Sequence, residues 1–210
     1  MMKTITKVVA IALLLPAVGF AVVIGDWETG LDGWIDWQGN ATMAGGQTEG
    51  VTLGSGSIVV DQTGWGQSLS IKLQDNGWVD EFMANSIFSI DVSVAATPGI
   101  VEGYSQVSSV TMNGNGPGWT ELVGGNPIEF FWWPDRPDET QTLQVDYSAF
   151  RDALADTSYI EIILTLNNGG GASTEMYFDN AQLVPEPATF GLLGIFGGGL
   201  ILARRHFKIC

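Results

Sequence analysis

The sequence predicts an all-β protein: a single β-sandwich of jelly-roll type with one short helix, flanked by an N-terminal signal peptide and a C-terminal transmembrane helix. Three observations lead to this prediction. Short segments of alternating apolar and polar residues recur through the middle of the chain, clusters of Gly, Asn, Asp and Pro separate them, and uncharged apolar runs stand near both ends. Many short strands separated by turns are typical of a two-layer sandwich.

The first 21 residues have the parts of a secretory signal peptide. Lys3 and Lys7 form a positive start, and an apolar stretch of suitable length follows. Gly19 and Ala21 then occupy the −3 and −1 positions of a small-residue cleavage site. We therefore expect residues 1–21 to be removed on export, with an uncleaved N-terminal anchor as the alternative.

Residues 22–184 form the predicted domain, in which period-two alternation marks eight strands. The predicted strands are 57–61, 68–74, 87–95, 105–112, 127–133, 141–147, 159–167 and 175–183. Helical spacing occurs at 147–156, where Phe150 and Leu154 stand four residues apart. The chain has no internal repeat and no linker within this range, so we expect one domain with one helix.

The charge of this part of the chain excludes one class of partner. Lys72, Arg136 and Arg151 are its basic residues, whereas residues 22–187 hold all 23 acidic ones. Nucleic-acid binding needs clustered Lys and Arg, so it is excluded. The negative charge favours hydration and attracts divalent cations, and solubility alone is a sufficient explanation for it.

The cysteine and histidine inventory excludes several kinds of chemistry. Cys210 and His206 are the only residues of their types, and both lie in the basic tail. The predicted domain therefore has no disulfide, no thiol nucleophile, no imidazole base and no zinc or copper site with His or Cys ligands.

Four consecutive aromatic residues, Phe130 to Trp133, cannot all be buried in the core if they lie on one strand. On a strand, Phe130 and Trp132 face one side while Phe131 and Trp133 face the other, and a sandwich buries only one face of each sheet. The outer pair is either covered by a loop or exposed as a platform for a ligand. Six aromatic residues are candidates to line such a groove, although several of them must belong to the core. They are Trp65, Trp78, Tyr104, Trp119, Trp132 and Trp133.

The C-terminal segment predicts a membrane helix. Residues 188–203 carry no charge and span about 24 Å as a helix, a little less than a typical hydrocarbon core. Gly194 and Gly198 stand four residues apart, as in closely packed membrane helices. Arg204 and Arg205 follow directly, which predicts a cytoplasmic C-terminus.

Pro185, Glu186 and Pro187, followed by this glycine-rich helix and by Arg204 and Arg205, resemble the PEP-CTERM sorting signal of Gram-negative and related bacteria. The resemblance covers residues 185–210. It implies that a membrane peptidase of the exosortase type reads this motif, and that the helix holds the chain in the membrane until it is processed. The protein would then reach the cell surface or the extracellular matrix.

The two ends of the predicted domain carry a second resemblance. The stretch "GDWETGLDGWIDW" (25–37) would open the first strand with alternating acidic and aromatic residues and then turn at 30–34, and "MYFDNAQLV" (176–184), preceded by "SYIEIILTLNNGG" (158–170), would close the domain. These stretches are similar to carbohydrate-binding modules of the galactose-binding-like jelly-roll class. The resemblance implies a jelly roll whose first and last strands lie together. It also implies a structural Ca²⁺ near that junction.

The carboxylates that match the calcium site of that family are Glu28, with Asp26 beside it, and Asp179. Calcium takes six to eight oxygen ligands, which carboxylates and backbone carbonyls supply. The alternative is that Asp179 and Asn180 end a strand and that Glu28 is solvated. The sugar-binding residues of the family do not carry over by motif.

These observations favour an exported, non-catalytic surface or matrix protein that binds polysaccharide. A structural surface component with no small ligand is the alternative. A glycosidase or lyase that works through paired carboxylates is a further possibility, but the sequence has no compact Glu-x-Asp-x-x-Glu cluster to support it.

Overall fold

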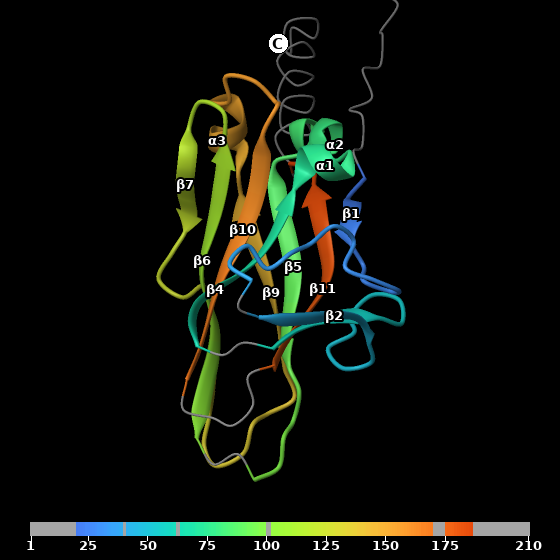
Figure 1. Ribbon diagram of the computed structural model, residues 1–210, viewed down its shortest axis with the longest axis vertical. Coiled ribbons are helices and arrows are strands. Elements are labelled where there is room, and N and C mark those ends of the chain that lie inside the picture. The colour runs from blue at the N-terminus through green and yellow to red at the C-terminus, as the bar shows by residue number, and fades with distance from the viewer. Residues whose placement is uncertain (1–19, 40, 62–63, 100–101, 170–174, 187–210) are drawn as a thin grey trace, which may run out of the picture. The chain divides into compact units, whose positions relative to one another are not determined.

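Two antiparallel sheets face each other in this protein, because its strands alternate apolar residues that point into one shared core (Figure 1). The computed structural model describes residues 20–39, 41–61, 64–99, 102–169 and 175–186, which lie in the unit Phe20–Glu186. The structure thus confirms the predicted all-β sandwich within these residues.

The strands and helices follow one another in a simple order. The strands are β1 (Val22–Gly25), β2 (Thr42–Gln47), β3 (Ser57–Asp61), β4 (Trp65–Lys72), β5 (Ile87–Val94), β6 (Gly103–Gly114), β7 (Gly118–Val123), β8 (Ile128–Trp132), β9 (Glu139–Asp146), β10 (Ile160–Gly169) and β11 (Glu175–Val184). The helices are α1 (Leu73–Asn76), α2 (Val79–Ala84) and α3 (Ser148–Asp152). Each of the eight predicted strands matches an observed one, with ends that differ by up to three residues.

The first sheet has the strand order β2-β3-β11-β5-β9. Strand β1 pairs with residues 181–183 of β11, beyond the part of β11 that pairs with β3. The first and last strands of the domain are therefore neighbours, as the sequence resemblance implied. Both ends of the described unit lie at the same end of this sheet (Figure 1).

The second sheet has the order β4-β10-β6-β7, and β8 also pairs with β6. Strand β7 pairs with residues 110–114 of β6, whereas β8 pairs with residues 103–107. The long strand β6 thus carries two shorter strands end to end along one edge. Strand β8 therefore lies beside the first half of β6, which begins at the end of the sandwich away from β1 (Figure 1).

The core lies between the two sheets and is rich in large aromatic side chains. Trp27 and Trp34 are fully buried, with ring centroids 5.6 Å apart, and the Trp34 indole donates a hydrogen bond to the Ile24 carbonyl. The segment after β1 therefore folds into the core instead of extending the strand. The prediction that the start of 25–37 forms a strand is wrong, because β1 ends at Gly25 and Trp27 adopts a positive φ angle that a strand does not allow. The turn predicted at 30–34 is confirmed, since the Trp34 amide donates to the Leu31 carbonyl at 2.8 Å.

The predicted helix is present at 148–152, but α1 and α2 make it one of three, so the prediction of a single helix is wrong. Helix α1 is a single turn that Gly77 closes in the left-handed conformation, and α2 buries only Phe82. Such short segments show too little of the helical period to be recognised in the sequence.

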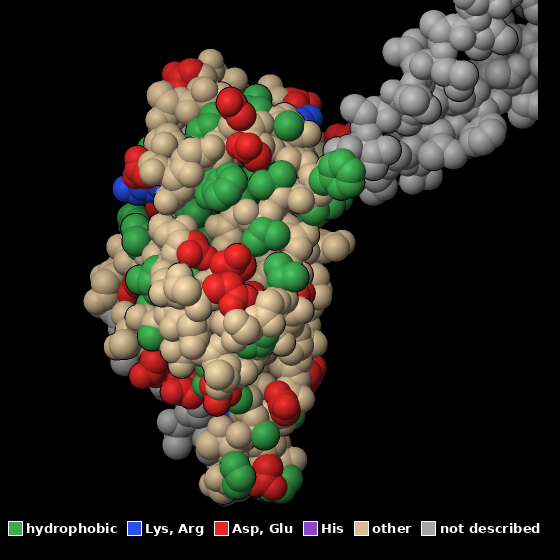
Figure 2. All heavy atoms as spheres, turned by 90° about the vertical axis from the view of Figure 1, so that its right-hand side faces the viewer, with side chains coloured by type: hydrophobic (Ala, Val, Ile, Leu, Met, Phe, Trp, Pro, Cys, Tyr) green, Lys and Arg blue, Asp and Glu red, His purple; other side chains and the backbone are tan. Residues whose placement is uncertain are grey.

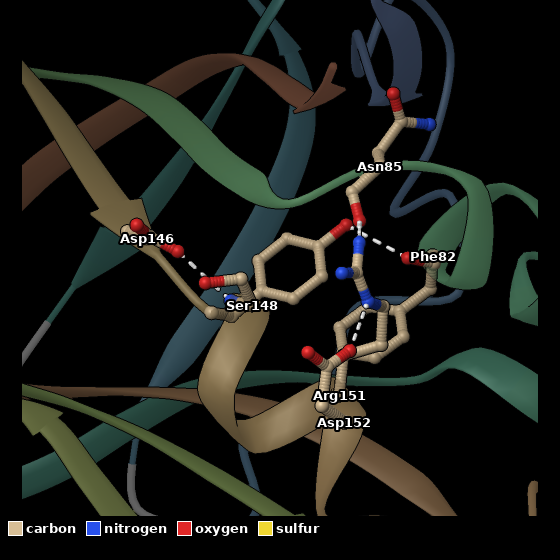
Figure 3. Close-up of polar contacts among 7 residues, drawn as sticks. Phe82, Asn85, Asp146, Ser148, Arg151 and Asp152 are labelled. Atoms are coloured by element: carbon tan, nitrogen blue, oxygen red, sulfur yellow. Dashed lines mark hydrogen bonds and ion pairs between the residues drawn. The ribbon is translucent and has the colours of Figure 1, made fainter. Parts of the chain in front are cut away.

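Helices α2 and α3 are held together by stacking and hydrogen bonds (Figure 3). The Tyr147 ring stacks on Phe82 at 4.2 Å, and its hydroxyl donates to the Phe82 carbonyl at 3.0 Å. Arg151 donates to the Asn85 carbonyl at 2.6 Å and pairs with the exposed Asp152. Burial raises the pKa of the Tyr147 phenol. These contacts close the end of the sandwich where β1 begins.

The predicted signal peptide and membrane helix lie outside the described residues, apart from Phe20 and Ala21. Of the predicted sorting motif, Pro185 and Glu186 are described and Pro187 is not. In the described part of the chain, no helix is long and apolar enough to cross a membrane. Figure 2 shows Asp and Glu side chains spread over one face of the unit, with few Lys or Arg side chains among them.

Candidate functional site

The outer face of the second sheet carries the candidate site. Leu69, Leu164 and Val110 form one row across β4, β10 and β6 and point into the core, which fixes the face of every other residue on these strands. By that alternation Asn167 points outward, and its register partner Trp65 lies on the same face. Gly169, Tyr104 and Phe131 form the next outward row, across β10, β6 and β8.

Aromatic rings contact one another along this face. The ring centroids of Trp65 and Tyr104 lie 6.0 Å apart, edge to face, and those of Tyr104 and Phe131 lie 5.9 Å apart. Trp65 is 69% exposed, Phe131 64% and Trp133 71%. We call Trp65, Tyr104, Phe131 and Trp133 the aromatic row. Residues from β4, β6 and the end of β8 meet in it.

Gly169 makes room for the row. A Cβ atom at this position would lie 2.5 Å from the Tyr104 hydroxyl and 2.6 Å from the ring carbon that bears it. The Tyr104 ring therefore lies directly against the backbone of β10, which lets it reach both Trp65 and Phe131. The bulge next to Trp65 is stabilised by a hydrogen bond that the Gly66 amide donates to the Asn167 side chain at 2.7 Å. This bond fixes the backbone that carries Trp65.

An open hollow of about 600 Å³ lies at the Phe131 end of the row. Its walls are Glu102, Gly103, Tyr104, Phe131, Trp132 and Trp133. Large exposed apolar surfaces in a folded protein mark interaction sites. Flat rings beside an open hollow suit a ligand that presents extended apolar faces together with polar edges.

The four aromatic residues 130–133 divide as the alternation predicts. Phe130 and Trp132 are 1% and 5% exposed and belong to the core, while Phe131 and Trp133 face outward. The alternative of a covering loop is therefore wrong. The prediction of Trp132 as a binding candidate is wrong, because its ring packs inside the sandwich although the residue borders the hollow.

Arg136 supports this part of the site from the inside. It is 2% exposed, its guanidinium lies 5.2 Å from the centroid of the Trp132 ring, and it donates a hydrogen bond to the Glu175 carbonyl. Burial lowers the pKa of the guanidinium. Arg136 thus links the segment after β8 to the start of β11 and holds Trp132 beneath the row.

The other aromatic candidates lie apart from the row. Trp119, on β7, is 56% exposed and contacts Trp37 edge to face, with 5.6 Å between the ring centroids. Trp78 is half-buried and borders a separate hollow of about 390 Å³ together with Asp26 and Asp32. The structure therefore brings Trp65, Tyr104 and Trp133 together and separates Trp78 and Trp119 from them.

Glu28 and Asp179 both contact the loop between β2 and β3. Asp179 is fully buried and accepts hydrogen bonds from the Thr52 and Leu53 amides at 2.6 and 2.7 Å. Glu28 accepts hydrogen bonds from the amide and the hydroxyl of Ser55. The two carboxylates thus hold neighbouring positions of one loop.

The pKa values of the two carboxyls shift in opposite directions. Burial raises the pKa of Asp179, although the amides of Leu53, Thr52 and Asn180 favour its charged form. The Ser55 hydroxyl and amide lower the pKa of Glu28 below its ordinary value of 4.5. The Glu28 contact therefore stabilises the fold at neutral pH, and this contribution is lost as the pH falls through the lowered pKa.

The fit of these residues to calcium is poor. Asp179 and Glu28 each accept hydrogen bonds from backbone amides, and Asp26 accepts one from the Glu28 amide at 3.3 Å, so all three predicted carboxylates already bond to protein N–H groups. Within the described residues, no three His, Cys, Asp or Glu side chains come together to hold a metal ion. Calcium at Asp26, Glu28 and Asp179 stays a prediction from the sequence resemblance.

Thermal unfolding separates calcium from these hydrogen bonds. Because these carboxylates bond to protein N–H groups and do not gather with a third in the described residues, we expect the same melting temperature in calcium and in chelator. Asp179→Ala should lower the free energy of unfolding by about 3 kcal/mol in either condition, since hydrogen bonds to charged groups are lost. Asp152→Ala, at an exposed position, is the control. A melting temperature that falls in chelator, and no longer does so in Asp179→Ala, would instead support a calcium site.

Comparison with solved structures shows which known proteins have a similar fold. No protein-family model matches the chain, and no curated protein matches it. Among solved structures, the chain is similar to the carbohydrate-binding module TmCBM27, described for specific mannan recognition, with a TM-score of 0.50 and 11% identity over 80% of this chain and 100% of that one. At this identity the similarity shows the fold, which is the jelly roll of carbohydrate-binding modules.

Two further solved structures are similar. The CBM27-1 module of Caldicellulosiruptor saccharolyticus, in complex with mannohexaose, has a TM-score of 0.49 and 14% identity over 81% of this chain and 100% of that one. The CBM22-1 xylan-binding domain of Paenibacillus barcinonensis Xyn10C has a TM-score of 0.46 and 17% identity, with 80% and 95% covered.

Proposed function

We propose that this chain is an exported, non-catalytic protein that binds polysaccharide through the aromatic row. One observation carries the proposal: Trp65, Tyr104, Phe131 and Trp133 gather on the outer face of one sheet, with three of the four rings largely exposed. Pyranose rings present flat C–H faces that pack on aromatic rings and hydroxyl edges that stay hydrated. A row of exposed rings therefore suits a sugar chain.

The negative charge of the domain favours a polysaccharide over a nucleic acid as the polymer that the row binds. Residues 22–187 contain Lys72, Arg136 and Arg151 as their only basic residues, and Arg136 is buried. Stacked bases of a nucleic acid would also suit aromatic rings, but the phosphates would meet an acidic surface. The fold, which is shared with carbohydrate-binding modules, supports the same choice.

The position of the row suits a protein attached through its C-terminus. Val22 pairs with Leu183 at one end of the sandwich, and the row lies at the other end, where β4 and β6 begin and β10 ends (Figure 1). A chain held by a sorting signal after Val184 would leave the row free to meet surrounding polysaccharide. We propose a place at the cell surface or in the extracellular matrix.

Retention of the full-length protein on insoluble polysaccharides tests the proposed function. We expect at least one column among mannan, xylan, glucan, chitin and its deacetylated form chitosan to retain the protein and to release it when the matching soluble sugar is added. If none of these polymers retains it, a structural surface component without a small ligand becomes the better account.

Processing at the C-terminus is a separate expectation. Replacing Pro185, Glu186 and Pro187 by alanine should leave a longer, membrane-held form, because an exosortase-type peptidase would no longer read the motif. Intact-mass analysis of the surface protein measures the difference. Alanine at the exposed Thr48 and Glu49 is the control and should leave processing unchanged. A wild-type surface protein that still ends at Cys210 would refute processing.

A further inference from the structure

We infer that the aromatic row takes polysaccharides that carry protonated amino sugars in preference to neutral ones, and that it rejects polymers of uronic acids. This inference rests on the proposed function and names the chemistry of its ligand. Three features support it: acidic groups beside the rings, the lack of a basic group in the walls of the hollow, and the orientation of the nearest cation.

Acidic side chains border the exposed rings. Glu102 forms part of the wall of the hollow, beside Tyr104 and Phe131. Glu129 precedes Phe131 by two residues on β8, so both side chains lie on the outer face, and Glu129 is exposed. The end of the row at β8 therefore presents two carboxylates next to aromatic faces.

The walls of the hollow contain one acidic residue and no basic one among the six residues that form them. The nearest guanidinium, that of Arg136, is 2% exposed and packs over the inward ring of Trp132. Lys72 lies at the end of β4 opposite to Trp65, and Arg151 lies in α3, where it donates to the Asn85 carbonyl (Figure 3). A uronic acid carboxylate would thus meet like charge without a cation to offset it.

An ammonium group on a sugar can interact both with the aromatic rings of the row and with the carboxylates beside them. A cation over an aromatic face gains a factor of about two to five in affinity at an exposed site. An exposed pair with a carboxylate adds a factor of up to about five, which salt reduces. The same groups give a neutral sugar only the ring contacts, so we expect it to bind more weakly, and removing the carboxylates should reduce the difference between the two ligands.

Affinities of the full-length protein for three soluble oligomers of equal length test the inference. The oligomers are built of glucosamine, of N-acetylglucosamine and of galacturonic acid, and all three are measured at the same mildly acidic pH, at which the sugar amine is protonated. We expect the glucosamine oligomer to bind about tenfold more tightly than the acetylated one, and the galacturonic acid oligomer not to bind. A change of Glu102→Gln with Glu129→Gln should remove most of this difference. Glu121→Gln, at an exposed position on β7, is the matched control and should not.

The outcomes separate the inference from the proposed function. Equal binding of the acetylated and free oligomers, lost in Phe131→Ala, would refute the preference for amines but support polysaccharide binding. Binding of the galacturonic acid oligomer would refute the rejection of uronic acids. Polylysine that competes as well as the glucosamine oligomer, with no effect of Phe131→Ala, would show general attraction of cations and overturn the inference. Absence of binding to any sugar polymer would refute the proposed function itself.

Discussion

Replacing Phe131 and Trp133 together by alanine is expected to abolish retention of the protein on polysaccharide. Both rings are largely exposed and border the same hollow, so a bound sugar chain would pack against them. An aromatic residue at the centre of an interface is worth about 2 kcal/mol or more, which is roughly a 30-fold change in affinity for each ring. The melting temperature should stay within a few degrees of that of the wild type, because neither ring supports the core.

The matched control for this experiment is the second exposed aromatic pair. Trp37 and Trp119 contact each other and are 52% and 56% exposed, yet they lie apart from the row. Alanine at both positions should leave retention unchanged. If this control loses retention and the Phe131 and Trp133 variant keeps it, the binding site lies at the Trp37–Trp119 pair and the proposed site is wrong.

The second large effect is expected at Trp132, the inward neighbour of these rings. Trp132→Ala should lower the free energy of unfolding by about 3–5 kcal/mol, as the loss of large core aromatics does. It also removes the ring beneath the Arg136 guanidinium. Trp133→Ala, one residue away, should change it by no more than about 0.5 kcal/mol. Unfolding in urea measures both values, and similar losses for the two variants would contradict the assignment of the two faces.

Much of the fold can be predicted from alternation along single strands. The segment 128–132 shows this most clearly, because its burial follows the period of two without exception. The pairing of the first and last strands followed from the resemblance of the two ends of the domain, and β1 and β11 confirm it. Strand β2, with the sequence TMAGGQ, was not predicted, since two glycines and few β-branched residues give it little strand character.

The candidate site could be predicted only in part. Trp65, Tyr104 and Trp133 were candidates as single residues, but their meeting depends on the strand order β4-β10-β6 and on the pairing of β8 with β6. No local pattern in a single sequence encodes the order of strands in a sheet. Phe131 was predicted to share a face with Trp133, but the alternation alone does not say which pair of rings faces outward. The role of Gly169 could not be predicted, because it depends on the ring of a residue on the next strand.

The segment between β1 and β2 shows why the strand predicted at the start of 25–37 is wrong. The stretch 25–37 alternates acidic and aromatic residues and so imitates a strand, but Trp27 and Trp34 both turn into the core. The Asp32 carboxylate accepts hydrogen bonds from the amides of Asp26 and Trp27, which stabilises a turn in place of a sheet pairing. Side-chain hydrogen bonds to the backbone thus overrode the alternation.

The most direct test of the central claim is a titration of isotope-labelled protein with a soluble sugar oligomer, followed through the indole N–H signals in NMR spectra. Binding at the aromatic row predicts that the signals of Trp65 and Trp133 shift progressively, while those of the buried Trp27 and Trp34 stay in place. Shifts confined to Trp119 and its partner, or no shift at saturating oligomer, would contradict binding at the aromatic row.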